Sequence, residues 1–307
     1  GTLFPYTTLF RSVLMNGFED DFVPKGATFT GKRKRARSTM LRVANCLLGE
    51  DLGDDTLIIG TSGRYEFKNK GIDVFLESLN RLNRDKDLKK KVLAFVNVPS
   101  WVGDPREDLQ KRLKSKDKFT EPLQCPFITH WLHNMTHDQV LDMLKYLGMG
   151  NRPEDKVKVI FVPCYQDGHD GILNKHYYDL ILGEDLSVYP SYYEPWGYTP
   201  LESVAFRVPT ITTDLAGFGL WVNSLKNQHG INDGVEVLHR SDYNYSEVAD
   251  GIKDTVALFS TKTEAEIKEI RKRAGQVAEQ ALWKHFIQYY YEAYDIALRN
   301  AMKRQLK

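Results

Sequence analysis

Short apolar runs alternate with helix-like periodicity along most of the chain. Four to eight apolar residues bounded by glycine or polar turns are typical of buried strands, and such runs occur at 56–62, 92–98, 157–163, 186–189, 208–214 and 235–238. Between them apolar residues recur at helical spacing, as in Val74, Phe75, Leu79 and Leu82. Strands that alternate with helices predict an α/β fold with a parallel sheet.

The two ends of the chain depart from this pattern. Residues 1–12 have no initiating Met and look like translated sequencing adapter, so we expect a non-native leader there. We expect a sheet-containing domain at 13–260 and a helical segment at 261–307, with a break at Ala274-Gly275. The helical segment carries an aromatic stripe of Trp283, Phe286, Ile287, Tyr290, Tyr291 and Tyr294.

Composition excludes several classes of protein. The 307 residues carry a net charge of +1 with 27% charged residues, which gives no global field that would favour nucleic acid or a membrane surface. The chain contains no run of about 18 apolar residues, so we expect no membrane span. Its three cysteines are odd in number and form no Cys-x2-Cys pair, which indicates reduced thiols in a cytoplasmic protein.

Two further patterns each have a functional and a structural interpretation. The basic run 32–37 is either a polyanion patch or the solvated face of a helix, and we favour the helix face. The histidines His130, His133 and His137 are either a metal site on a helix or part of a polar loop. No cysteine or carboxylate completes a ligand set, so we predict no metal and no cofactor.

The loop 63–71 follows the first predicted strand and carries two cations, Arg64 and Lys70. In a strand-to-helix loop such a pair can hold a diphosphate without a metal, since Arg offers a fork to two oxygens and Lys a mobile point charge. The alternative is a surface salt bridge with Glu66 or Asp73. The loop therefore predicts a phosphate site or an ordinary ion pair.

The stretch 189–202 joins another predicted strand to a helix that Thr199 could cap and Pro200 could open. Two carboxylates, Glu194 and Glu202, stand on either side of the helix start. Strand-loop-helix junctions lie at the carboxyl edge of a parallel sheet, where ligands bind, and a helix start favours anions. We predict the ligand site at this edge.

The string S-Y-Y-E-P-W-G-Y-T-P-L-E at 191–202 closely resembles the donor-site signature of glycogen synthases of the animal and fungal type, and G-R-Y-E-x-x-N-K-G at 63–71 resembles the same family. The resemblance extends over about 14–303. It implies a Rossmann-like, doubly wound parallel sheet, the carboxyl-terminal half of a GT-B glycosyltransferase. Residues 13–260 would then bind a nucleotide sugar, and 261–307 would pack on an amino-terminal domain that is missing here.

The resemblance also implies an activity and its residues. Glucose would pass from UDP-glucose or ADP-glucose to the non-reducing end of an α-1,4-glucan, with retention at the anomeric carbon. Arg64 and Lys70 would bind the departing diphosphate, and Glu194 would lie near the glucose hydroxyls. The implied donor-binding residues are Tyr177, which would stack on the base unless it is a core tyrosine, Glu202 on the ribose, and the backbone of Trp196, Gly197, Tyr198 and Thr199.

This half of the enzyme is expected to be inactive alone, because the α-glucan acceptor would be bound by the missing domain. The full-length protein is expected to form homo-oligomers. The alternatives are a non-catalytic nucleotide-sugar-binding module or remnant, and another retaining GT-B glycosyltransferase. The family also has an arginine-rich helix that senses sugar phosphate. Here Lys268, Arg271, Lys272 and Arg273 are interleaved with Glu264, Glu266 and Glu269, so we expect that regulatory site to be lost.

Overall fold

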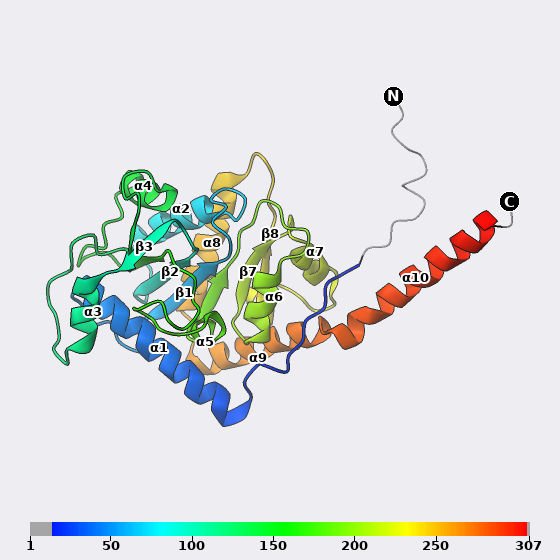
Figure 1. Cartoon of the computed structure of the whole chain (residues 1–307), viewed down its shortest axis with the longest axis horizontal. Coiled ribbons are helices and arrows are strands. Elements are labelled where there is room, and N and C mark those ends of the chain that lie inside the picture. Colours follow the sequence, from blue (N-terminus) through cyan, green and yellow to red (C-terminus); the bar gives the residue numbers. More distant parts are fainter. Residues whose placement is uncertain (1–13, 306–307) are drawn as a thin grey trace.

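Six parallel strands form the central sheet of the computed structural model, which describes residues 14–305 (Figure 1). The prediction for residues 1–12 lies outside the described residues. The strands pair in the order β5-β2-β1-β6-β7-β8. Their bounds are β1 (Leu57–Ser62), β2 (Val92–Asn97), β5 (Val157–Val162), β6 (Leu186–Val188), β7 (Thr210–Thr213) and β8 (Val235–Leu238). Each lies within a run predicted from the sequence, so the predicted α/β fold is confirmed.

Helices cover both faces of this sheet (Figure 1). Alternate strand residues divide between the faces: Leu57 and Ile59 of β1 pack with one set of helices, and Ile58 packs with the other. The first face is covered by α2 (Ile72–Asn83), α4 (Gln139–Leu147) and α8 (Tyr245–Ser260). The second face is covered by α1 (Gly26–Leu48), α5 (Tyr177–Ile181), α6 (Tyr198–Ala205) and α9 (Glu264–Gln280).

The remaining elements lie around this core. A small antiparallel pair, β3 (Val102–Pro105) and β4 (His130–Leu132), stands beside α3 (Glu107–Lys114). The helix α7 (Gly217–Ser224) and the 3₁₀ turn Ile231–Asp233 connect β7 to β8. Among residues 14–305, no helix is both long enough and apolar enough to cross a lipid bilayer.

The carboxyl-terminal helices divide at a different place from the one predicted. The helix α9 continues through Ala274-Gly275 and ends at Gln280, and α10 (Trp283–Gln305) begins after Leu282. Gly275 stays within α9, which packs its buried side chains against α6 and its neighbours. By contrast, α10 extends away from the body of the molecule (Figure 1).

The order of the strands sets the position of the site. From β1 the chain builds outward through β2 to β5, and then returns to the other side of β1 to build β6, β7 and β8. The connections that leave the carboxyl ends of β1 and β6 therefore run to opposite faces of the sheet. Such a reversal opens a crevice in which ligands of doubly wound folds bind.

Candidate functional site

The two loops that matched the predicted signatures lie side by side at this crevice. The amide of Tyr192 donates a hydrogen bond of 2.7 Å to the carbonyl of Asn69, which ties the loop after β6 to the loop after β1. Gly71 closes the first loop with φ +68°, and a Cβ there would lie 2.1 Å from the carbonyl oxygen of Pro190. Only glycine fits this approach, so the two loops depend on each other for their shape.

Lys70 and Glu194 form an ion pair across the two loops, between the lysine Nζ and the glutamate Oε2. The side chains are 12% and 18% exposed, so the pair is largely shielded from water. Backbone contacts hold Glu194 in place: its amide donates to the carbonyl of Leu215 at 3.2 Å, and its carbonyl accepts from the amide of Gly217 at 3.1 Å. The two residues are 124 positions apart in sequence, and the fold brings them together.

Arg64 points into solvent, with 75% of its side chain exposed, and pairs with Glu66 at 3.0 Å. This is the surface salt bridge that the sequence left open as an alternative for Arg64. Lys70 does not form the predicted surface salt bridge with Glu66 or Asp73. Its partner is Glu194. Exposed pairs contribute only about 0–1 kcal/mol, so the guanidinium can exchange Glu66 for an anion at little cost.

A cavity of about 350 Å³ opens beside this pair of loops. It brings together residues from the ends of β1, β2 and β5 with the start of α5 and α6: Ser62, Arg64, Asn97, Gln166, Tyr177 and Thr199 are among its lining residues. Polar and aromatic groups thus converge at one concave site, which is typical of a small-molecule pocket.

Tyr177 contributes to this cavity and to the interior at once. Its hydroxyl lies 2.9 Å from the Ser62 hydroxyl, and the same serine lies 3.3 Å from the hydroxyl of Tyr189. Burial raises the pKa of the Tyr177 phenol well above its usual value, so the hydroxyl stays neutral. The hydrogen bond fixes the ring at the cavity wall, a position compatible with stacking on a base.

The helix α6 begins two residues before the predicted start, at Tyr198 and not at Pro200. Gly197 is its N-cap, with φ +105°, and Thr199 makes no capping hydrogen bond. The prediction of a Thr199 cap is wrong because the glycine can adopt the left-handed conformation that turns the chain into the helix. The backbone amides of 196–199 donate no hydrogen bond to any group among residues 14–305. They are therefore free to donate to a ligand.

The side chains of this segment differ in their surroundings. The indole of Trp196 is buried against Phe218 and Phe286, at ring distances of 6.0 and 5.8 Å, so only its backbone is available to a ligand. Thr199 lines the cavity, and Glu202 stands one turn later on the same face of α6. Tyr178 donates a hydrogen bond of 2.8 Å to Glu202 Oε1. No motif or spacing in the sequence marks this tyrosine as a site residue.

The three histidines do not align on a helix. His130 belongs to β4 and is buried, His133 follows that strand and packs on Trp101 at 4.8 Å, and His137 precedes α4. The side chains of His133 and His137 are both exposed to solvent. His133 and His137 therefore lie in a polar loop, which is one of the two predicted alternatives.

His130 instead lies with Cys164 and Asp170, with ligand-type atoms within 4.8 Å of one another. Protein groups already contact its ring: Nδ1 lies 2.9 Å from the Thr129 hydroxyl, and Nε2 lies 2.7 Å from the backbone carbonyl of Asp170. The Asp170 carboxylate accepts from the amides of 172–174. Burial raises the pKa of the Cys164 thiol to about 12, so it keeps its proton. The arrangement is that of a hydrogen-bonded interior cluster.

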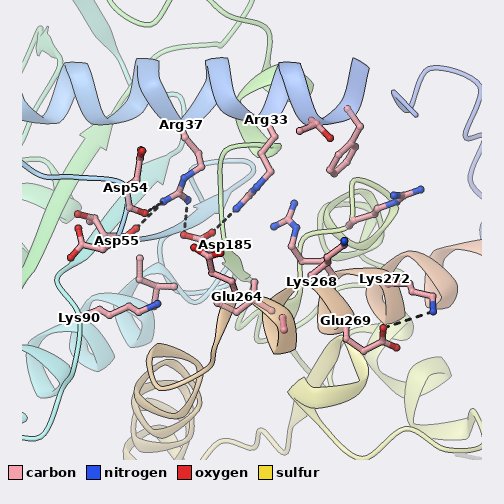
Figure 2. Close-up of a pocket in the computed structure, with 18 residues that line it drawn as sticks. Arg33, Arg37, Asp54, Asp55, Lys90, Asp185, Glu264, Lys268, Glu269 and Lys272 are labelled. Atoms are coloured by element: carbon pink, nitrogen blue, oxygen red, sulfur yellow. Dashed lines mark hydrogen bonds and ion pairs between the residues drawn. The ribbon is translucent and has the colours of Figure 1, made fainter. Parts of the chain in front are cut away.

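A second and larger cavity, of about 910 Å³, lies at the opposite edge of the sheet, where β1 and β6 begin. Arg33 and Arg37 reach into it from α1, and Lys268 and Lys272 project from α9 (Figure 2). Buried Arg271 also lines it, and its Nη2 has no hydrogen-bond partner among the described residues. This cavity and the candidate site therefore lie at opposite ends of the strands.

The basic run that lines this cavity was predicted to be the solvated face of a helix. It does lie on α1, but two of its cations are turned inward: Arg33 Nη2 and Arg37 Nη1 donate to the two oxygens of Asp185 at 2.6 and 2.7 Å. Burial raises the pKa of Asp185, and the two guanidiniums together with the Ile58 amide outweigh it, so the pKa lies below its usual value. The solvated interpretation is wrong for Arg33 and Arg37.

Two solved structures show a similar fold. The Anabaena protein HepE, in a crystal structure with UDP and glucose, matches with a TM-score of 0.50 and 16% identity over 93% of this chain and 56% of its own. The amino-terminal domain of a Candida albicans trehalose-6-phosphate phosphatase matches with a TM-score of 0.53 and 10% identity, over 92% of this chain and 49% of its own. At these identities the likeness concerns the fold alone.

Sequence comparison identifies closer relatives. The glycogen [starch] synthase of Neurospora crassa is 28% identical over 81% of this chain and 42% of its own length. Isoform 2 of the Saccharomyces cerevisiae enzyme is 29% identical over 83% of this chain and 44% of its own length, so the chain spans less than half of these relatives. A family model described as glycogen synthase matches residues 47–104 and 108–307. With most of its length matched, the chain belongs to the glycogen synthase family.

Proposed function

We propose that this chain is the donor-binding part of a retaining glucosyltransferase that transfers glucose from a nucleotide diphosphate glucose to an α-1,4-glucan. The observation that carries the proposal is the Lys70–Glu194 ion pair, which joins the two signature loops at the reversal of the sheet.

The charges suit a donor that separates into a sugar cation and a diphosphate. As the glycosidic bond breaks, positive charge develops on the sugar ring and negative charge on the leaving diphosphate. We expect Glu194 to stabilise the positive charge on the sugar, and Arg64 and Lys70 to stabilise the negative charge on the diphosphate. Preorganised charges of this kind need little reorganisation during the reaction, which is the main source of rate enhancement in such sites.

Lys70 links the two halves of this arrangement. An ammonium group has three protons to donate, and one is engaged with Glu194. The remaining two are available to diphosphate oxygens in the crevice. Because the pair is shielded from solvent, its charges interact more strongly with a ligand than exposed charges would.

The donor's other groups find candidate partners nearby. The ring of Tyr177 lies at the cavity wall for the base, and Glu202 lies one turn into α6 for the ribose. The free amides of 196–199 are available to the diphosphate and the glucose. HepE, which has the same fold, was crystallised with UDP and glucose, and this favours UDP-glucose over ADP-glucose as the first donor to test.

Calorimetric titration with UDP-glucose and ADP-glucose tests the proposal. The Arg64→Ala variant removes one diphosphate partner, and Arg84→Ala removes another exposed cation, at the far end of α2. We expect a uridine or adenosine donor to bind the wild-type chain and the Arg84 variant equally, and the Arg64 variant about 10-fold more weakly.

Two outcomes would contradict the proposal. A folded wild-type chain that binds neither donor would show that it has no donor site. Equal weakening by both arginine variants would show that binding follows the overall charge of the protein and not the signature loop.

A further inference from the structure

Tyr178 makes a contact that the proposed function does not yet use. Its hydroxyl donates to Glu202 Oε1 at 2.8 Å. The other oxygen, Oε2, has no hydrogen-bond partner among residues 14–305, and the side chain is only partly buried. One oxygen is therefore held by the protein and the other remains free to accept from a ligand.

The tyrosine ring is fixed on three sides by other aromatic rings. It stacks on Phe206 with ring centroids 5.2 Å apart and an angle of 2° between the planes. Phe22 lies 5.0 Å away and Tyr177 lies 5.3 Å away, both tilted. Since Phe206 ends α6 and Glu202 lies one turn before that end, the ring and its acceptor are positioned by the same helix.

The groups that face Glu202 are neutral. They are the phenols of Tyr177 and Tyr178 on α5 and of Tyr198 on α6, and burial raises the pKa of each above its usual value. Burial also raises the pKa of Glu202, and the Tyr178 hydrogen bond is the contact that lowers it. No cation among the described residues contributes, so the phenol is what favours the charged carboxylate.

We propose that Tyr178 is a positioning residue for nucleotide binding: it holds one oxygen of Glu202 and directs the free oxygen to the ribose hydroxyls of the donor. The inference rests on the proposed function, in which Glu202 contacts the ribose. A charged carboxylate accepts hydrogen bonds from two neighbouring hydroxyls about twice as strongly as a neutral group would. Without the phenol, Glu202 loses its orientation, and its pKa rises further because the hydrogen bond that lowers it is gone.

The test compares UDP with 2′,3′-dideoxy-UDP by calorimetry in the wild-type chain, Tyr178→Phe and the control Tyr146→Phe. Tyr146 is a strongly exposed tyrosine on α4, remote from the crevice. We expect Tyr178→Phe to weaken UDP about 10-fold and to leave dideoxy-UDP unchanged, because the effect passes through the ribose hydroxyls. The loss should grow between pH 8 and pH 5.5, since removal of the donor raises the pKa of Glu202.

A thermodynamic cycle with Glu202→Gln completes the test. If Tyr178 acts through Glu202, the double variant binds UDP no more weakly than Glu202→Gln alone. Equal UDP affinity in Tyr178→Phe and wild type would overturn the inference while the proposed function stands. Equal loss of UDP and dideoxy-UDP would also overturn it and leave Tyr178 a purely structural role.

Two further outcomes are distinguishable from these. A wild-type chain that binds neither nucleotide contradicts the proposed function, and the inference falls with it. If Tyr178→Phe does not fold, Phe206→Leu replaces it. That change loosens the ring stack but keeps the hydroxyl, and it should weaken UDP while leaving dideoxy-UDP unchanged; an equal effect on both ligands would overturn the inference.

Discussion

At the scale of single residues, Glu184 is an unusual ionisable group outside the candidate site. It is buried beneath the central strand, where its Oε1 lies so close to Gly60 that a Cβ there would be only 2.1 Å away. The Ser187 hydroxyl donates to its Oε2 at 2.6 Å. Burial nevertheless dominates and raises the pKa of Glu184 to about 8.

Because the pKa of Glu184 is raised in the folded protein, we predict that the free energy of unfolding falls as the pH rises. Between the unfolded value of 4.5 and about 8 the folded protein binds a proton that the unfolded chain has released. Stability from this group is therefore present below pH 4.5 and is lost as the pH rises through 8, by about 1.4 kcal/mol per pH unit in between.

Glu184→Gln isolates this effect, because the amide keeps an acceptor for Ser187 and cannot ionise. The free energy of unfolding in urea should fall less between pH 5.5 and pH 8.5 in the variant than in the wild type. Parallel curves for the two proteins would mean that Glu184 does not carry the raised pKa in the folded state.

At the scale of elements, the start of α6 depends on one backbone conformation. Gly197 has φ +105°, and a side chain there would be strained whatever the space around it. The sequence signals Thr199 and Pro200 predicted the helix, but its first residue was decided by the glycine. The free amides of 196–199 keep their direction only while this turn is intact.

Gly197→Ala is therefore expected to destabilise the protein by about 1–2 kcal/mol and to weaken UDP binding. The matched control is Thr263→Ala, which removes the capping box at the start of α9. The control should lower stability by about 1 kcal/mol and leave UDP affinity unchanged. Denaturation and calorimetry on both variants measure this, and equal UDP affinity in Gly197→Ala would show that the turn is not part of the site.

At the scale of the whole molecule, the sheet could be predicted from sequence and the site only in part. The six strands are short apolar runs, and all of them were identified because burial on both faces leaves a clear signal. The Lys70–Glu194 pair could not be assigned, since the spacing within each loop says nothing of the 124 positions between them. The inward turn of Arg33 and Arg37 was missed for the same reason: their partner, Asp185, lies on another element.

The extension of α10 predicts an uneven distribution of stability. Phe286 near its start is buried against the body, whereas Tyr294 and Leu298 further along are 59% exposed. Phe286→Ala should cost about 3–5 kcal/mol through the cavity it leaves. Leu298→Ala should change the free energy of unfolding by no more than about 0.5 kcal/mol. A large loss in the second variant would show that the exposed half of α10 packs on another surface in solution.

The central claim is that the loop after β1 holds a diphosphate through Lys70, and one measurement tests it most directly. It is the calorimetric titration of UDP and uridine into the wild-type chain, Lys70→Ala and the control Lys68→Ala, in which an exposed lysine of the same loop is removed. We predict that Lys70→Ala weakens UDP about 10-fold or more while uridine is unaffected, and that Lys68→Ala changes UDP binding little. UDP binding that survives the loss of Lys70 unchanged would contradict the account.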